Sequence, residues 1–151
     1  MTDGVWIAVD VGTVRVGVAR SDPRGVLAVP VRTLSRNART DADLTELAAL
    51  VAEYEAVGVV VGLPQTLAGR EGPAAELARE YGGALAARIA PVSVHYLDER
   101  LTTVSAQRKL RDGGIRGRAG RAVIDQAAAV ELLQHWLELR RSGQPDPGET
   151  T

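Results

Sequence analysis

Acidic residues at three places along the chain have the types and settings that suit metal binding or proton transfer. The first is Asp10, the polar residue within the apolar run Val5–Val11, whose composition is typical of a strand covered on both faces. An ionised carboxylate in such a strand loses its hydration, which is unfavourable unless a cation or hydrogen bonds replace the water. In a purely structural alternative, Asp10 lies just past the strand and hydrogen-bonds to the turn at Gly12.

An acidic pair, Asp98 and Glu99, directly follows another strand-like segment at residues 92–97. Parallel sheets bind their ligands at the carboxyl ends of strands, so the pair stands where a site is expected. Because neighbouring residues of a strand point to opposite faces, only one of the two should face that site. The structural alternative is a solvated pair, or Asp98 as a cap for the following helix.

Asp125 lies on the apolar face of a predicted helix. Ala129, Leu132 and Trp136 follow it at i+4, i+7 and i+11, which places the carboxylate on the buried side. The side chains of the alanines at 127–129 are short, so the helix backbone can lie close to the sheet. The alternative is an acidic residue in the first helical turn, stabilised by the helix dipole.

These carboxylates converge if the first and fifth strands lie near each other. The chain has no Cys, and its two histidines, His95 and His135, lack the spacing of metal ligands, so both are expected to be packing or surface residues. Hard oxygen ligands without Cys or paired His select Mg²⁺ or Mn²⁺ over Zn²⁺. Two such ions can activate a water and stabilise the leaving oxygen of a phosphodiester.

A basic segment lies between the second and third acidic positions. Residues 100–121 contain seven basic residues and one acid, although the whole chain has a net charge of −1. Arginine binds phosphate oxygens in a bidentate manner, and the glycines at 112–120 predict a loop that can adapt to a phosphate backbone. The alternative is a solvated loop beside a helix. The segment has no aromatic residues, which argues against a base-stacking platform.

Length and composition indicate one globular domain. The chain has 151 residues, of which 45% are hydrophobic and 25% charged, and we expect a domain over residues 1–141 with a disordered tail over 142–151. The absence of Cys excludes disulfides and thiolate chemistry. No stretch has the length of a spanning helix or a signal segment, so we expect a cytoplasmic protein without a membrane partner.

The order of elements predicts an α/β fold with a five-stranded mixed sheet and helices on both faces. An antiparallel meander of three strands comes first, and strands then alternate with helices in the order βββαβαβαα. Right-handed crossovers place the fourth and fifth strands beside the first, on the side away from the meander. The predicted strands cover 5–11, 14–19, 26–31, 57–63 and 92–97, and the predicted helices start at 41, 72, about 102 and 122.

Four motifs, in this order, resemble the YqgF (RuvX) family of Holliday junction resolvases and pre-16S ribosomal RNA nucleases. They lie at residues 10–22, 61–64, 98–103 and 125–129. The resemblance implies a ribonuclease H-like fold, a cytoplasmic location and metal-dependent phosphodiester hydrolysis, with Asp10, Glu99 and Asp125 at the family's acidic positions. One departure is Ala68 before Gly69, where family members often have an acidic or amide residue.

The sequence therefore predicts a nuclease that acts on structured RNA and matures the 5′ end of pre-16S rRNA, alone or on a ribosomal particle. Asp10, Glu99 and Asp125 would hold Mg²⁺ or Mn²⁺, with Asp98 as the alternative to Glu99. The basic residues expected to bind phosphates are Arg15, Arg100, Arg108, Lys109, Arg111, Arg116, Arg118 and Arg121.

Three alternatives remain at this stage. A resolvase of branched DNA would require a homodimer with two active sites, whereas the RNA nuclease is expected as a monomer or a homodimer. A non-catalytic nucleic-acid-binding or transcription-associated module would not respond to metal. The Asp-x-Gly-Thr pattern at 10–13 is similar to the phosphate loop of actin-like ATPases, but that loop works between two domains.

Overall fold

The structure is a computed structural model that describes residues 4–64, 69–99, 118–143 and 149–150. The elements along the chain are β1 (Trp6–Val11), β2 (Arg15–Ser21), β3 (Ala28–Ser35), α1 (Ala42–Glu53), β4 (Gly58–Leu63), α2 (Pro73–Ile89), β5 (Ser93–Asp98), α4 (Arg118–Arg141) and β6 (Glu149–Thr150). In the part of the chain that the structure describes, every helix is too short or too polar to span a membrane.

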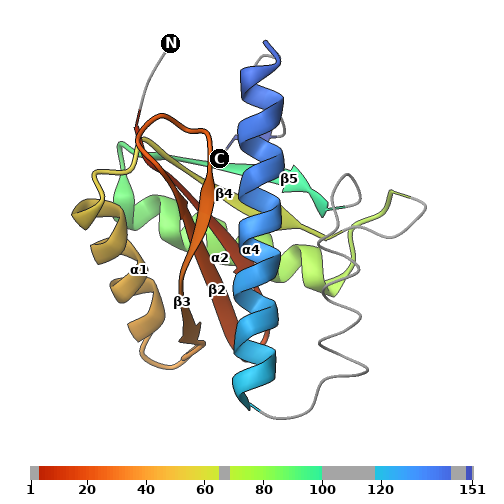
Figure 1. Ribbon diagram of the computed structural model, residues 1–151. Coiled ribbons are helices and arrows are strands. Elements are labelled where there is room, and N and C mark those ends of the chain that lie inside the picture. Colours follow the sequence, from red (N-terminus) through yellow and green to blue (C-terminus); the bar gives the residue numbers. More distant parts are fainter. Residues whose placement is uncertain (1–3, 65–68, 100–117, 144–148, 151) are drawn as a thin grey trace.

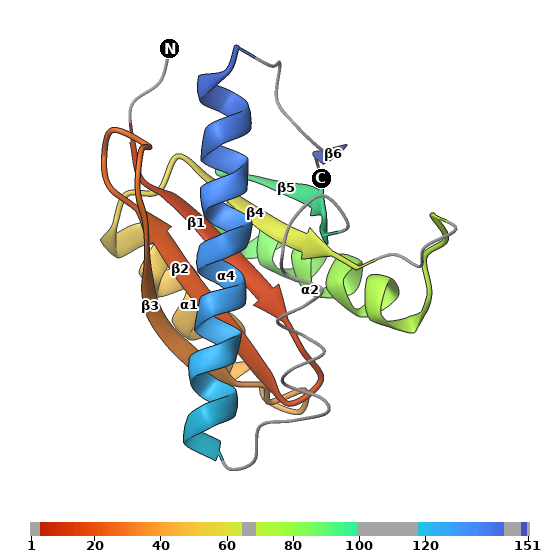
Figure 2. The same cartoon turned by 45° about the vertical axis from the view of Figure 1, so that its right-hand side comes forward.

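The strands form one mixed sheet in the order β3-β2-β1-β4-β5-β6 (Figure 1). β2 is antiparallel to β1 and β3, whereas β4 is parallel to β1 and β5. The predicted meander and the predicted places of the fourth and fifth strands are therefore confirmed. The two-residue β6 pairs antiparallel with β5 at its outer edge (Figure 2), a strand that the sequence prediction for residues 142–151 did not contain.

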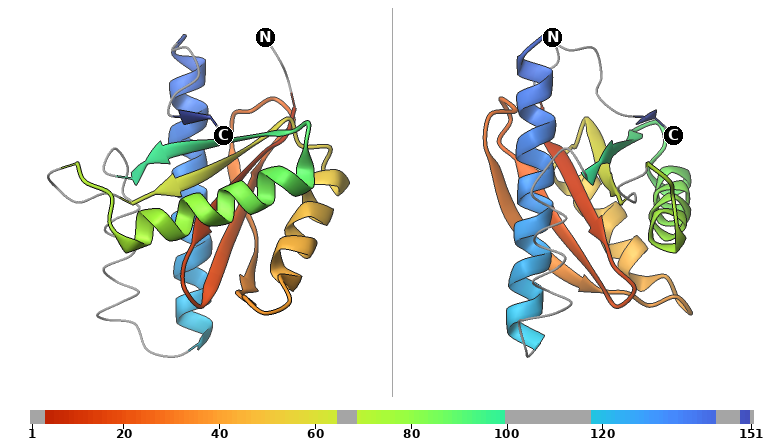
Figure 3. Two further views of the ribbon diagram at one scale, coloured as in Figure 1. Left: turned by 180° about the vertical axis from the view of Figure 1, so that it is seen from behind. Right: turned by 90° about the vertical axis from the view of Figure 1, so that its right-hand side faces the viewer.

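Helices cover both faces of the sheet, as predicted, and give three layers (Figure 3). α1 and α2 cover one face, where Ile7 and Val9 of β1 pack with Leu47 of α1 and Leu85 of α2. α4 runs across the opposite face. Successive residues of β1 thus enter different cores, because side chains alternate across a strand.

The contact between α4 and the sheet includes small side chains beside larger ones such as Leu132 and Trp136. Ala8 and Ala19 of the sheet and Ala128 and Ala129 of α4 are all fully buried there. Short side chains on both sides let the helix backbone lie close to the strands, as the alanines at 127–129 predicted. Since Asp125 lies one turn before Ala129, this close packing also brings its carboxylate to the sheet.

The largest differences from the predicted boundaries are at β3 and at the start of α4. β3 covers Ala28–Ser35, whereas the predicted strand covered 26–31. α4 begins at Arg118, four residues earlier than predicted, so residues 118–120 are helical and not part of the predicted loop. Arg and Ala are good helix formers, and they offset the cost of about 1 kcal/mol for Gly120. α1 begins at Ala42, one residue after the predicted start, and the side chain of Asp41 makes no capping hydrogen bond. The predicted short helix starting at about 102 lies outside the described residues.

Candidate active site

Asp10 is buried in the sheet on the face covered by α4. It lies within β1, two residues after Ala8 of the α4-side core, and it is 0% exposed. The alternative in which Asp10 lies past the strand is therefore wrong. Its partner in the antiparallel register with β2 is Gly17. Next to this carboxylate, the neighbouring strand thus presents no side chain.

The backbone of Asp125 fills the space above Gly17. A Cβ at Gly17 would collide with the carbonyl group of Asp125, so α4 rests directly on β2 at this point, about two turns after the helix begins. Asp125 is 1% exposed, and its Oδ2 accepts a hydrogen bond from Nε of Arg15 at 2.9 Å. Arg15 comes from the same strand as Gly17, two residues earlier, and so lies on the same face. The buried position predicted for Asp125 is confirmed.

Glu99 reaches the same face from the far side of the site. It follows β5, which is separated from β1 by β4, and it is 2% exposed. A Cβ at Gly62 of β4 would collide with the Glu99 carboxylate, so this side chain lies over β4 and extends toward β1. In the parallel pairing of β1 with β4, Val9 lies opposite Val61. The next residues, Asp10 and Gly62, are therefore neighbours as well.

Asp98 and Glu99 lie on opposite faces, as the sequence predicted for neighbours. Asp98 is half-buried and is in register with Leu63, whose side chain belongs to the core under α1 and α2. The side chain of Glu99 instead contacts Gly62 on the α4 face. This arrangement favours Glu99 over Asp98 as the acidic partner of Asp10.

The three acidic residues therefore occupy adjacent positions across the sheet. Asp10 is at the centre, Asp125 lies over Gly17 on one side, and Glu99 lies over Gly62 on the other. Neighbouring strands are about 4.8 Å apart, so the three residues lie on the same part of this face. We call Asp10, Glu99 and Asp125 the acidic row.

The acidic row has the chemistry of a site for a hard divalent cation, because all its side-chain donors are carboxylate oxygens. Burial favours such an ion further, since it relieves the desolvation and mutual repulsion of the carboxylates. In the described part of the chain, however, no three such side chains are grouped closely enough to hold one ion. Asp125 is engaged by Arg15. Metal binding by this row therefore requires side-chain adjustment, and it remains a prediction.

Of the predicted phosphate-binding residues, the structure describes the side chain of Arg15, which is 18% exposed and bound to Asp125. Arg118 and Arg121 belong to the first turns of α4. The side chains of these two residues lie outside the described part of the structure, as do Arg100, Arg108, Lys109, Arg111 and Arg116.

A further buried carboxylate, Asp43, was missed by the sequence analysis. Its oxygens accept hydrogen bonds from Nη1 of Arg36 at 2.9 and 3.1 Å, from the backbone N–H of Asn37 at 3.1 Å and from the Tyr81 hydroxyl at 2.8 Å. Burial alone would raise the pKa of Asp43, but the hydrogen bonds from Asn37 and Tyr81 and the charge of Arg36 outweigh it and lower the pKa. For Tyr81, burial and the bond to Asp43 raise the pKa.

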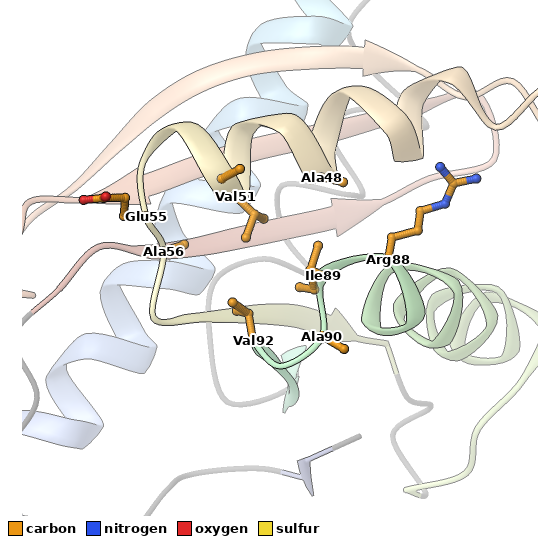
Figure 4. Close-up of a pocket in the computed structure, with 9 residues that line it drawn as sticks. Ala48, Val51, Glu55, Ala56, Arg88, Ile89, Ala90 and Val92 are labelled. Carbon is orange, nitrogen blue, oxygen red and sulfur yellow. The ribbon is translucent and has the colours of Figure 1, made fainter.

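Two other features of the described structure are separate from the acidic row. A cavity of about 410 Å³ lies between the carboxyl ends of α1 and α2 (Figure 4), and residues such as Val51, Ala56 and Ile89 line it on the opposite face of the sheet. His95 packs between the rings of Trp6 and Trp136, with centroids 5.6 and 5.2 Å away. The prediction that His95 is a packing residue and not a metal ligand of a paired-histidine site is thereby confirmed for its packing.

Comparison with known proteins assigns the chain to a family. The model of the RuvX family, described as Holliday junction resolvase, matches residues 4–139. The chain belongs to the RuvX family. Relatives called "Putative pre-16S rRNA nuclease" include one from Mycobacterium sp. strain KMS, 60% identical over 146 residues, which are 97% of this chain and 86% of the relative. Another, from a Nocardioides species, is 53% identical and covers 99% of this chain and 97% of its own.

Solved structures support the same fold. The Thermus thermophilus RuvC protein in complex with a Holliday junction aligns with a TM-score of 0.58 at 12% identity, covering 98% of this chain and 99% of that one. A second Thermus thermophilus RuvC structure aligns with a TM-score of 0.55. The ribonuclease H-like fold expected from the RuvX motifs is confirmed. The family assignment also confirms that the chain is a nuclease, a hydrolase of phosphodiester bonds.

Proposed function

We propose that this chain hydrolyses phosphodiester bonds of structured RNA with the help of Mg²⁺ or Mn²⁺, and that its substrate is pre-16S rRNA. The observation that carries the proposal is the acidic row, a set of buried carboxylates on one face of a ribonuclease H-like sheet. The substrate is taken from the relatives at 53–60% identity, which are named for pre-16S rRNA. We expect it to act in the cytoplasm, free or on a ribosomal particle.

Asp10, Glu99 and Asp125 would hold the divalent ions. Such ions, when bound, lower the pKa of a water molecule and neutralise the charge of the leaving oxygen. The chain itself supplies the three carboxylates on one face of the sheet. Because Asp10 lies in the centre of the row and cannot leave its strand, it would fix the position of the reacting phosphate relative to the other two carboxylates.

Arg15 would have two tasks at the edge of the row. Its Nε donates to Asp125 and thereby orients that carboxylate. A guanidinium has five N–H donors, so the rest of the group would bind a substrate phosphate beside the row. The seven basic residues between 100 and 121 would add further phosphate contacts. Substrate binding should then weaken steeply with salt.

The direct test is cleavage of a labelled rRNA precursor that contains the 5′ end of 16S rRNA, with Mn²⁺ and with chelator. We expect discrete cleavage with Mn²⁺ and none with chelator. Glu46→Gln, which removes an exposed acid on α1, serves as the matched control and should cleave like the wild type. Cleavage that persists in chelator would contradict the metal-dependent mechanism.

A second candidate substrate is branched DNA. It is favoured by the description of the family as Holliday junction resolvase and by the likeness to RuvC, which was solved with such a junction. A resolvase needs two active sites in a dimer, so the same assay should include a four-way junction and the mass of the protein in solution. A dimer that cuts the junction symmetrically and leaves the rRNA precursor intact would favour this candidate. Binding of both substrates without cleavage would indicate a non-catalytic module.

A further inference from the structure

Glycines occupy the two positions that flank Asp10 in the neighbouring strands, and a residue of the acidic row covers each of them. Above Gly17 lies the backbone of Asp125, and above Gly62 lies the carboxylate of Glu99. We propose that Gly62 is a positioning residue of the active site, whose missing side chain lets Glu99 cross β4 and join Asp10. This inference rests on the proposed function, because it treats Glu99 as a residue of the metal-binding row.

Glu99 needs the space above Gly62 because its backbone lies two strands away from that of Asp10. It follows β5, and β4 lies between β5 and the strand that carries Asp10. Two strand spacings, about 10 Å, therefore separate the two backbones. The Glu99 side chain covers about half of this gap by lying over Gly62, where a Cβ would collide with its Oε1 and crowd its Cδ and Cγ atoms.

The atoms that crowd Gly62 also determine how a substitution would act. They belong to the end of a flexible side chain, which can rotate away while the backbone of β4 and β5 stays in place. Gly62→Ala should therefore fold with little loss of stability but with a displaced carboxylate. Active-site groups must keep their positions to within about 0.5 Å, so the displacement should weaken metal binding.

Gly58 provides a matched control on the same strand and the same face. A Cβ at Gly58 would collide with the ring of Trp6, a rigid group packed in the α4-side core. Gly58 lies four residues before Gly62, about 13 Å along the strand, and so is far from the acidic row. Gly58→Ala should destabilise the fold more than Gly62→Ala and leave metal binding unchanged.

The experiment measures the melting temperature of the full chain in chelator and over a series of Mn²⁺ concentrations. The variants are Gly62→Ala, Gly58→Ala, Glu99→Gln, and Gly62→Ala combined with Glu99→Gln. We expect Gly62→Ala to melt near the wild type in chelator and to need about tenfold or more Mn²⁺ for half-maximal stabilisation. Gly58→Ala should melt below the wild type in chelator and should need the same Mn²⁺ concentration as the wild type for half-maximal stabilisation. In the Glu99→Gln background, Gly62→Ala should not change the Mn²⁺ requirement further, because its effect acts through Glu99.

The outcomes separate this inference from the proposed function. If Glu99→Gln raises the Mn²⁺ requirement and Gly62→Ala does not, the inference is wrong while the metal site stands. If Gly62→Ala melts below Gly58→Ala in chelator, the fold and not the Glu99 side chain takes up the crowding, which also overturns the inference. If Glu99→Gln leaves the Mn²⁺ response unchanged, the assignment of Glu99 in the proposed function is wrong.

Discussion

Carboxylates are buried on both faces of the sheet, and the two places differ in how the chain compensates the charge. On the face under α1 and α2, the buried carboxylate of Asp43 accepts hydrogen bonds from Arg36, Asn37 and Tyr81. On the face under α4, three carboxylates lie on the same part of the sheet, and Arg15 donates to one of them. A buried carboxylate that accepts several hydrogen bonds from the chain has a structural role, whereas neighbouring buried carboxylates repel one another, and a divalent cation would lower that repulsion.

The largest effect that distinguishes the two faces should come from Asp10→Asn. This isosteric change removes the central charge of the acidic row without removing volume. Metal ions supply several kcal/mol of transition-state stabilisation, so Mn²⁺-dependent cleavage should fall by about a thousandfold or more. The melting temperature in chelator should stay equal or rise, since a crowded buried charge is lost. Cleavage at the wild-type rate would remove Asp10 from the mechanism.

Asp43→Asn should have the opposite profile. It removes the anionic partner of the Tyr81 hydroxyl and one of the two carboxylates that pair with Arg36, the other being Asp41. Breaking such a buried pair costs about 3 kcal/mol of unfolding free energy. Urea unfolding measures this loss, and cleavage per folded molecule should match the wild type. A variant that keeps wild-type stability but loses cleavage would show that the comparison between the two faces is mistaken.

Arg15→Gln should produce a smaller change that depends on metal. Without the guanidinium, Asp125 loses a charge-assisted hydrogen bond, so the unfolding free energy in chelator should fall by about 1–3 kcal/mol. Saturating Mn²⁺ should recover much of this loss, because the ion replaces the missing positive charge. The control Arg32→Gln breaks an exposed ion pair with Glu46 and should change neither quantity measurably. If Mn²⁺ does not restore the unfolding free energy that Arg15→Gln loses, then the guanidinium of Arg15 and the metal ion do not both bind Asp125.

The smallest expected effect is a dependence on pH at the Asp43 face. The pKa of Asp43 in the folded state lies below its ordinary value of 3.8. Its contribution to stability is therefore fully present above about pH 4 and is lost as the pH falls through the lowered pKa. The difference in unfolding free energy between the wild type and Asp43→Asn should shrink when urea unfolding is repeated near pH 3. A difference that grows on acidification would have the wrong sign for this account.

Most of the fold and much of the acidic row could be predicted from the sequence. Apolar runs and helical periodicity predicted the meander, the crossovers and the buried positions of Asp10 and Asp125, because these patterns repeat over many residues. The choice between Asp98 and Glu99 depended on a shift of a single residue at the end of β5, and such a shift reverses the face. A pattern cannot locate a strand end that finely.

Contacts between distant segments could not be predicted from the sequence. Asp43 is held by Arg36 and Tyr81, which come from separate elements, and no local pattern relates them. One available signal was not used: glycine within an apolar strand indicates a close approach of another group. Gly17 and Gly62 both carry that signal, and they mark the two places where Asp125 and Glu99 approach the sheet.

The central claim is that the acidic row, and not Asp43, binds divalent metal. Thermal unfolding of the wild type, Asp43→Asn and Asp10→Asn in chelator and in Mn²⁺ tests it most directly. An ion that binds the folded state stabilises it by about 2.7 kcal/mol at a concentration of a hundred times its Kd. We predict equal Mn²⁺ stabilisation of the wild type and Asp43→Asn, with little or none for Asp10→Asn. Equal stabilisation of all three proteins, or of none, would contradict the account.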